Sequence, residues 1–142
     1  MKLLQILAVL LLLTFQAQAI TYYHRDYVDE WWAGKNYTLE YTWRYAKPKI
    51  KIDSVKADVY IVPYNCYNRE GIKVGGLYDS VTKKIFIFNT LTLNPDFAVA
   101  HEVGHFYDFN ILGTTPSYTR EDFANEYARR VIQWQRPTKK EI

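Results

Sequence analysis

The chain has a single cysteine, Cys66, among its 142 residues, and this excludes an internal disulfide framework. Glycine and proline are also scarce, with 6 and 5 residues, which excludes collagen-like and low-complexity chains. An excess of charge of one sign is nearly absent, because the formal net charge is only +3, too small for an obligate nucleic-acid binder. What remains is a globular chain that is long enough for one domain and too short for two.

Aromatic residues, in contrast, are abundant: 13 Tyr, 7 Phe and 4 Trp make up 17% of the chain. Many of them fall in the segment 22–45. Rings of this size either build a dense core or stand exposed to a ligand. For the segment 22–45 we favour the core, and a ligand-binding surface is the alternative.

The N-terminus has the three parts of a secretory signal peptide: a positively charged start, an apolar run over residues 3–15 and a small-x-small cleavage site at 17–19. Because a membrane-spanning helix needs about 20 apolar residues, this run is too short to cross a bilayer. We therefore expect residues 1–19 to be a signal peptide cleaved after Ala19. The protein would then be secreted or periplasmic, with no membrane span in its mature form. The alternative is an uncleaved N-terminal membrane anchor.

The mature chain, residues 20–142, is expected to form one α+β domain, because strand patterns come first and helix patterns last. The four-residue spacing of Tyr23, Tyr27 and Trp31 predicts a short helix over 22–33. Alternating and continuous apolar patterns after it predict a small, mostly antiparallel sheet. The predicted strands are a half-buried strand over 37–45, a strand beginning at Ile50 and Ile52, a strand over 59–64 closed by Pro63, and an antiparallel hairpin of 76–79 with 84–89.

Two helices are predicted in the C-terminal third. Asn94 is a good N-cap, Pro95 suits the first helical position, and Gly113 suits the C-terminal end. Thr119 is the predicted N-cap of the second helix, which runs to about Gln135.

The first of these helices carries the sequence His101-Glu102-Val103-Gly104-His105. Two histidines four residues apart share one helical face, with Cβ atoms roughly 5–6 Å apart. Both imidazoles can therefore reach one metal ion at about 2.0–2.1 Å, the distance that Zn²⁺ prefers. Glu102 lies about 100° further round the helix, where it can touch a metal-bound water. This pattern predicts one catalytic Zn²⁺ ion.

A catalytic zinc needs a third protein ligand, and the second helix offers two carboxylates. Glu121 is the better candidate, because Asn125, one turn further along the same face, can orient a zinc-binding histidine from behind. Glu126 is the alternative third ligand. Ala124 and Ala128 are small, so the two helices can approach closely.

Residues 101–105, followed by Glu121-Asp122-Phe123-Ala124-Asn125-Glu126-Tyr127-Ala128, resemble the gluzincin metallopeptidases. The form HExGH…ExxANxYA looks most like the small ImmA/IrrE-type members and the minimal single-domain gluzincins. The resemblance implies a zincin-like domain in which His101, His105 and Glu121 bind zinc and Glu102 is the general base and acid. The predicted export signal departs from the usual intracellular location of ImmA/IrrE-type proteins, so the resemblance extends to the zinc site and not to the substrate.

Together with the predicted export signal, this resemblance implies an exported zinc metallopeptidase that acts on a peptide or protein substrate, as an endopeptidase rather than an exopeptidase. The edge strand 76–79 would hold an extended peptide. Asp108 is expected to be a solvated acid at the helix end, with a place behind the metal ligands as the alternative. The donor that stabilises the oxyanion stays open among His24, Tyr107, Tyr118, Tyr127 and Arg129.

Two other functions compete with a peptidase. The first is an envelope or glycan-binding module on an inactive zincin scaffold, with Tyr41 and Trp43 among the rings that would stack on sugar. The second is a closed structural zinc site, for which Cys66 is the only soft fourth ligand. For Cys66 we favour a buried thiol instead. Nucleic-acid binding is not expected, because removal of the signal peptide leaves 17 basic against 15 acidic residues.

Overall fold

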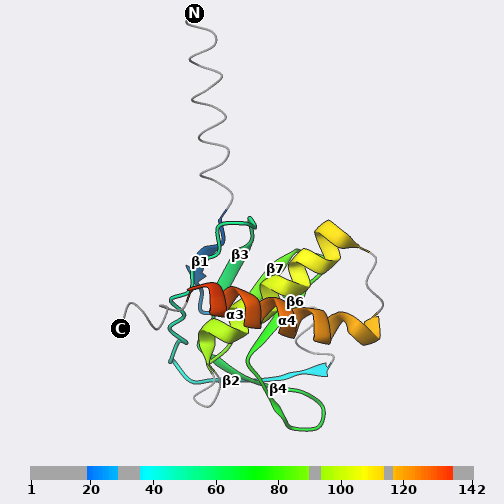
Figure 1. The fold of residues 1–142 in the computed structure, drawn as a ribbon. Helices are drawn as coiled ribbons and strands as arrows, with labels where there is room; N and C mark the ends of the chain where they lie inside the picture. Colours follow the sequence, from blue (N-terminus) through cyan, green and yellow to red (C-terminus); the bar gives the residue numbers. More distant parts are fainter. Residues whose placement is uncertain (1–18, 29–35, 90–93, 114–116, 136–142) are drawn as a thin grey trace, which may run out of the picture.

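The computed structural model describes residues 19–28, 36–89, 94–113 and 117–135, and the side chains of residues 117 and 118 are not described (Figure 1). These residues form a small α+β fold with two α-helices and mostly antiparallel strand pairing. In chain order, the elements are β1 (Thr21–His24), β2 (Thr38–Tyr41), β3 (Asp58–Ile61), β4 (Tyr64–Tyr67), β5 (Lys73–Val74), β6 (Gly76–Asp79), β7 (Lys84–Ile87), α3 (Pro95–Tyr107), the π-helical segment η1 (Asp108–Leu112) and α4 (Ser117–Gln135).

The strands form two sheets. The first has the order β1-β3-β7-β6, in which β1, β3 and β7 are parallel and β6 is antiparallel to β7. The second has the order β2-β4-β5 and is antiparallel throughout. Three of the five strand pairs are therefore antiparallel, while the four-stranded sheet itself is mixed. Strand β6 lies at the edge of this sheet, and α3 contacts both β6 and its neighbour β7.

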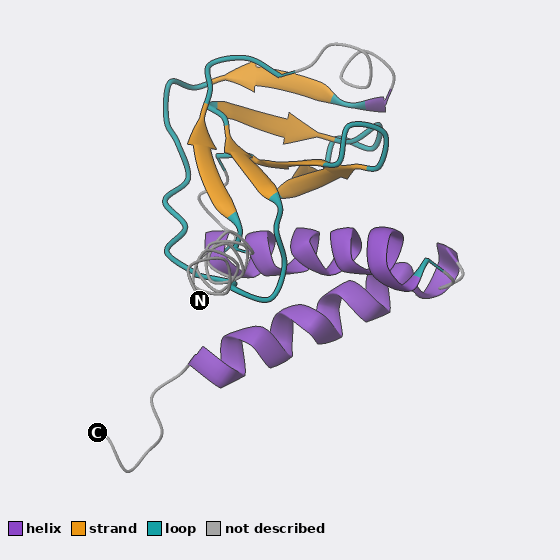
Figure 2. Cartoon of the chain, turned by 90° about the horizontal axis from the view of Figure 1, so that it is seen from above, coloured by secondary structure: helices purple, strands orange, loops and turns teal. Residues whose placement is uncertain are grey.

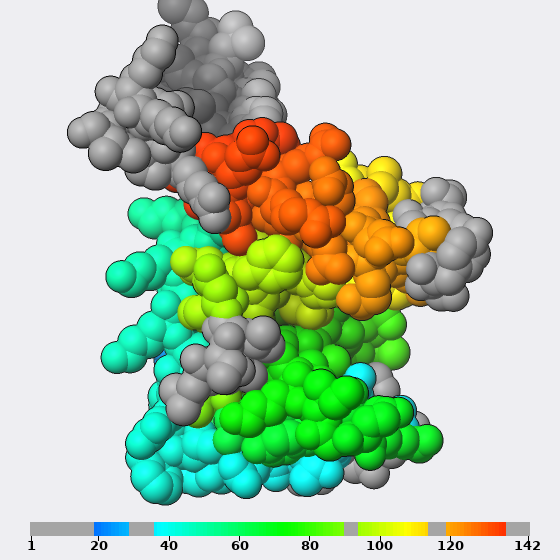
Figure 3. All heavy atoms as spheres, turned by 60° about the horizontal axis from the view of Figure 1, so that its bottom comes forward, coloured from blue at the N-terminus to red at the C-terminus, as the bar shows by residue number. Residues whose placement is uncertain are grey.

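Strand β7 is buried on both faces and separates two apolar clusters. Ile85 and Ile87 pack with residues of α3 and α4, whereas Phe86 and Phe88 pack with residues of the second sheet. Successive side chains of a strand point to opposite faces, so the helices cover one face of the four-stranded sheet and the second sheet covers part of the other. Figure 2 shows both helices on the same side of the strands. In Figure 3, α4 (orange to red) lies at one end of the molecule and the segment around β2 (cyan) at the other.

The predicted helix over 22–33 is wrong where the structure describes it, because residues 21–24 form strand β1. Thr21 N–H donates to the Ala57 carbonyl over 2.9 Å, and Tyr23 stacks on Tyr60 of the neighbouring strand at 5.2 Å between ring centroids. A spacing of four residues keeps side chains on one face of a helix, but it also keeps them on one face of a strand, whose period is two. The aromatic spacing therefore could not distinguish the two. Trp31 and the rest of this predicted helix, 29–33, lie outside the described residues.

The predicted strand over 37–45 is shorter in the structure, since β2 ends at Tyr41. Trp43 follows with a positive φ of 51°, a left-handed conformation that interrupts an extended strand. Its side chain is 71% exposed and that of Tyr41 57%, so these two rings do not belong to the core that we favoured for this segment. Tyr22 and Tyr37, in contrast, are partly buried.

Two further strand predictions are corrected. Ile50 and Ile52 are buried beneath the helices, as their apolar character suggests, but they lie in no strand. The predicted strand over 59–64 divides at Pro63 into β3 and β4, which belong to different sheets. Proline lacks the N–H that a strand interior needs, so the chain changes sheets there.

The predicted hairpin and the C-terminal helices are confirmed, with small shifts. Strands β6 and β7 pair antiparallel. The Asn94 side chain accepts a hydrogen bond from the Asp96 N–H over 2.9 Å, and Gly113 ends the helical region at a φ of 68°. Helix α4 begins at Ser117, so Thr119 lies inside its first turn and is not the N-cap. Within the described parts, neither helix has the length and apolar character that crossing a membrane requires. The predicted signal peptide, apart from Ala19, lies outside them.

Candidate metal centre

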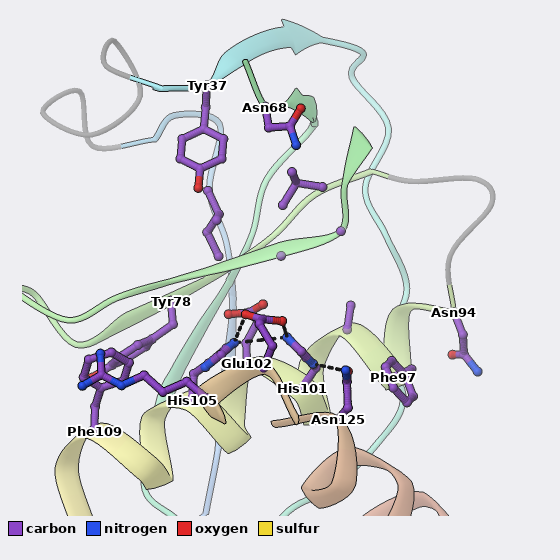
Figure 4. Close-up of a pocket in the computed structure, with 17 residues that line it drawn as sticks. Tyr37, Asn68, Tyr78, Asn94, Phe97, His101, Glu102, His105, Phe109 and Asn125 are labelled. Carbon is purple, nitrogen blue, oxygen red and sulfur yellow. Dashed lines mark hydrogen bonds and ion pairs between the residues drawn. The ribbon is translucent and has the colours of Figure 1, made fainter. Parts of the chain in front are cut away.

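His101 and His105 lie side by side on α3 (Figure 4). Their Nε2 atoms are 3.1 Å apart, and their rings meet edge to face with 4.7 Å between centroids. Both side chains are largely shielded from solvent, with exposed fractions of 15% and 11%. The four-residue spacing thus places both nitrogens at one point above the helix, as helical geometry requires.

Glu121 of α4 reaches the same point from the other helix. Its Oε2 lies 3.1 Å from Nε2 of His101, and its Oε1 lies 2.9 Å from Nε2 of His105. Glu126, the alternative third ligand, faces away from this point and pairs with Arg130 at 2.9 Å and Arg129 at 3.5 Å. Of the two carboxylates, the structure therefore brings only Glu121 to the histidines.

Asn125 determines which nitrogen of His101 faces the cluster as an acceptor. Its Oδ1 lies 2.9 Å from Nδ1 of His101. An amide oxygen can only accept, so Nδ1 carries the hydrogen and the neutral ring presents a lone pair at Nε2. This is the arrangement in which an outer partner fixes the tautomer of a metal-binding histidine.

The donor set fits a divalent cation. Ligands held at about 2.0–2.1 Å in a tetrahedral zinc site are roughly 3.3 Å from one another. The two Nε2 atoms and the Glu121 oxygens are separated by 2.9–3.1 Å, close to this spacing. Lone pairs of neutral imidazoles and a carboxylate repel one another unless a proton or a metal ion lies among them. Imidazole nitrogen and carboxylate oxygen are also the donors that Zn²⁺ accepts.

Protonation of His105 is disfavoured by its surroundings. Burial lowers the pKa of His105 below its ordinary value, and this outweighs the opposing effect of the nearby Glu121 carboxylate. A neutral His105 keeps a lone pair that can bind a metal.

Glu102 is buried beside the two histidines, with an exposed fraction of 6%. The ligand atoms of Glu102, His101 and His105 all lie within 4.8 Å of one another. Burial raises the pKa of Glu102 from 4.5 to about 8, and the Glu121 carboxylate adds to this effect. Strand β6 covers Glu102 through Gly76, where a Cβ would lie 2.9 Å from the Glu102 Cγ. The close approach of strand and helix at this carboxylate therefore depends on a glycine.

A second glycine sets the distance between the helices. A Cβ at Gly104 would lie 2.9 Å from Ala124 Cα and 3.2 Å from Tyr127 Cβ. Ala124 and Ala128 are fully buried, as expected from their small size at the helix contact. Because α3 and α4 touch at Gly104, Glu121 lies close enough to contact histidines on the other helix.

A cleft of about 1010 Å³ opens above the cluster, between the helices, the edge strand β6 and the second sheet. In Figure 4, Tyr37 points across it towards Glu102 from the side of β2. Tyr78 and Phe109 lie at the His105 end, whereas Phe97 and Asn94 lie at the His101 end (Figure 4). Arg120 and Glu121 also line the cleft.

The oxyanion donors considered from the sequence whose side chains are described do not line this cleft. His24, Tyr107, Tyr127 and Arg129 do not line it, and the side chain of Tyr118 lies outside the described residues. Sequence reasoning missed Tyr37, Tyr78 and Arg120. The position of Tyr78 on the hairpin strand that contacts α3 was a usable signal, and so was that of Arg120 beside Glu121. Tyr37 gave no comparable signal, because its place depends on the second sheet.

The structure corrects the interpretation of Asp108 and confirms the one favoured for Cys66. Asp108 is 1% exposed, so it is not a solvated acid at the helix end. Cys66 is a free, fully buried cysteine that packs with Phe86 and Phe88, as favoured from the sequence. Among the described residues, the group of possible metal ligands contains His101, Glu102 and His105 without Cys66. Burial raises the pKa of the Cys66 thiol to about 12, which keeps it protonated and a poor ligand.

Comparisons with models of protein families, with curated proteins and with solved structures found no match. The chemistry of the site therefore follows from its own residues.

Proposed function

We propose that this protein is an exported zinc-dependent peptidase whose metal is held by His101, His105 and Glu121. The observation that carries the proposal is the convergence of two imidazole nitrogens and one carboxylate within 2.9–3.1 Å, from two different helices. When bound, zinc supplies a water of lowered pKa and polarises a carbonyl. The similarity of residues 101–105 and 121–128 to gluzincins supports the same reaction.

Glu102 is the proposed general base and acid. Its ligand atom lies within 4.8 Å of those of both histidines. With Glu121 as the third ligand, the Glu102 carboxylate is left available for a proton. A positioned carboxylate can take the proton of the attacking water and deliver it to the leaving amine. Gly76 holds the strand directly over this carboxylate and limits the water around it.

The cleft suits an extended peptide. Strand β6 is the edge of its sheet among the described strands, and its residues Gly76, Leu77 and Tyr78 line the cleft. An edge strand has unpaired backbone groups that can bind another chain as an added strand. A peptide bound there passes over the histidines and Glu102, and so an endopeptidase is the form of the activity that we propose.

The decisive experiment compares wild-type protein with Glu102→Gln. We expect both to bind about one zinc per chain, while cleavage of an unfolded test protein falls by about 10²–10⁴-fold in the variant. Metal content is measured on the same preparations as cleavage. Glu126→Gln is the matched control, since Glu126 is an exposed glutamate that pairs with Arg129 and Arg130. Cleavage by Glu102→Gln at the wild-type rate would contradict the role of Glu102.

A second candidate function is glycan binding, and a separate surface favours it. Tyr41 and Trp43 are exposed beside a small hollow of about 280 Å³ that polar residues such as Glu40, Arg44 and Asn65 also line. Trp43 adopts its exposed position at a positive φ, a strained conformation of the kind that concentrates at binding sites. Pull-down on immobilised glycans should be lost in Trp43→Ala and kept in Ile72→Ala, another exposed apolar residue. Failure of the wild type to bind removes this candidate.

A further inference from the structure

Arg120 is the one arginine among the described residues that line the cleft. Its guanidinium carbon lies 4.0 Å from the centroid of the Phe109 ring. Figure 4 places Phe109 at the His105 end of the cleft, next to Tyr78. A guanidinium stacked on an aromatic face is held in one plane, and a planar guanidinium binds carboxylates with two parallel hydrogen bonds. Arg120 is therefore a fixed cationic group at one end of the cleft.

Asp108 helps to hold this arginine in place. Its Oδ2 lies 4.0 Å from Nε of Arg120. The Asp108 carboxylate is 1% exposed, and its oxygens accept no hydrogen bond from the described residues. A buried carboxylate without hydrogen bonds is stabilised by a neighbouring positive charge. The carboxylate in turn attracts the guanidinium and holds it nearby. Asp108 is thus a positioning residue that keeps the guanidinium at the His105 end.

Arg120 also stands next to the proposed metal ligand in the chain. Glu121 follows it on α4, so the guanidinium and the ligand carboxylate leave the same helical turn about 100° apart. The other charged side chains among the described lining residues, Glu102 and Glu121, are acidic and belong to the metal centre. Apart from the proposed metal ion, Arg120 is thus the cationic group among the described lining residues that can bind a substrate carboxylate.

We propose that Arg120 binds a carboxylate group of the substrate, so that the cleft selects peptides with an acidic group on the His105 side of the metal centre. This inference rests on the proposed peptidase function. The carboxylate has two sources, an acidic side chain within the peptide and the C-terminal carboxylate of the peptide. Both present the same chemistry to the guanidinium.

The test measures peptide binding and not cleavage. Fluorescein-labelled Ala-Ala-Phe-Ala-Ala-Ala is prepared as an amide with a single Glu or Gln at each position in turn, and once as the free acid. Binding to zinc-loaded Glu102→Gln protein is followed by fluorescence anisotropy. We expect at least one Glu position, or the free acid, to bind about tenfold more tightly than its neutral counterpart. When Arg120→Gln is added, we expect the ratio of the two affinities, acidic peptide to neutral peptide, to fall to about one.

Three further variants make the outcome decisive. Arg129→Gln removes an exposed arginine of the same helix, which lies outside the cleft, and should keep the wild-type ratio. Arg120→Lys keeps the charge without the planar fork and should keep part of the ratio. Arg120→Gln alone leaves the buried Asp108 carboxylate without its cation and could fold poorly for that reason. The double variant Asp108→Asn/Arg120→Gln removes both charges together and so avoids this problem.

An unchanged ratio in folded Arg120→Gln or in the double variant would overturn the inference, and so would equal binding of acidic and neutral peptides by the parent protein. A preference for the Glu peptides identifies an acidic side chain as the ligand, and a preference for the free acid identifies the C-terminus. If the wild type binds these peptides without cleaving any substrate, the peptidase proposal fails while the carboxylate preference is still measured.

Discussion

The two faces of the four-stranded sheet each cover a buried ionisable side chain, but the groups that surround this side chain differ between the faces. On the helix face, Glu102 lies under Gly76 beside two histidines and a second carboxylate. On the other face, Cys66 lies among Phe86 and Phe88. Burial disfavours the charged form of both groups. Among the described residues, only those on the helix face bring together donor atoms that can hold a cation. This difference separates a candidate reactive group from a packing residue.

The largest expected effect that tests this contrast is the loss of a proposed metal ligand. Glu121→Ala should weaken zinc binding by at least about 100-fold, because loss even of an outer partner of a metal ligand costs about 10–100-fold. Asn125→Ala, which removes such a partner of His101, should fall within that smaller range. Competition with a chromogenic chelator measures both affinities.

Glu126→Ala is the control for this series, since Glu126 is exposed and pairs with arginines on its own helix. Its zinc affinity should equal that of the wild type. Equal affinities for Glu121→Ala and Glu126→Ala would mean that the helix face holds no metal through Glu121, and the contrast between the two faces would disappear.

The next effect comes from the contact between the helices. Gly104→Ala should lower the free energy of unfolding by about 1–3 kcal/mol, because the added Cβ would collide with the Ala124 backbone and not with a flexible side chain. If the helices move apart to relieve this collision, Glu121 moves away from the histidines, and zinc binding should weaken. Chemical denaturation and chelator competition measure the two effects on one preparation.

Gln133→Ala, on the exposed part of α4, is the control and should change neither quantity. Wild-type stability together with wild-type zinc affinity in Gly104→Ala would show that the helices tolerate a wider spacing than the structure has.

The candidate site was predictable where one helix determines it. His101 and His105 meet because α-helical geometry fixes residues four apart, and a capped helix was predicted around them. Glu121 and Asn125 were predictable in part, through their spacing on a second helix with small residues. Gly104 and Gly76 could not be recognised as contact points, because what each glycine touches lies on another element. The same holds for the burial of Asp108, which depends on how η1 packs.

The fold was least predictable in the aromatic N-terminal part. The hairpin of β6 and β7 has local partners, and the sequence pattern predicted it. Strand β1, in contrast, pairs in parallel with β3, more than 30 residues away, and no local signal reveals such a partner. The division of one apolar run at Pro63 into strands of two sheets is likewise decided by long-range pairing.

The buried acid of the helix face should also be visible in stability. In metal-free protein, Glu102 keeps its proton up to a pKa of about 8, whereas the unfolded chain loses it above about 4.5. The unfolded state then binds fewer protons, so this residue lowers the free energy of unfolding as the pH rises from 4.5 to 8. Glu102→Gln has no carboxylate to ionise, so its stability does not fall in this way. With both proteins treated with chelator, the free energy of unfolding of the variant should exceed that of the wild type by a larger margin at pH 8 than at pH 5. Parallel pH profiles would contradict the burial of this carboxylate.

The smallest effect concerns the other face, and it lies in a different pH range. The pKa of Cys66 is raised by burial from 9.0 to about 12, so the thiol stays protonated in the folded protein while the unfolded chain ionises above pH 9. The free energy of unfolding should therefore fall more steeply between pH 9 and 12 in the wild type than in Cys66→Ala. The cavity left by the substitution lowers stability equally at every pH, so the comparison uses the slopes and not the absolute values. Added zinc should leave this difference unchanged, since Cys66 stands outside the ligand group of the helix face. If zinc changes the difference between the two pH slopes, metal binding on the helix face affects the environment of Cys66, and the thiol is more than a packing residue.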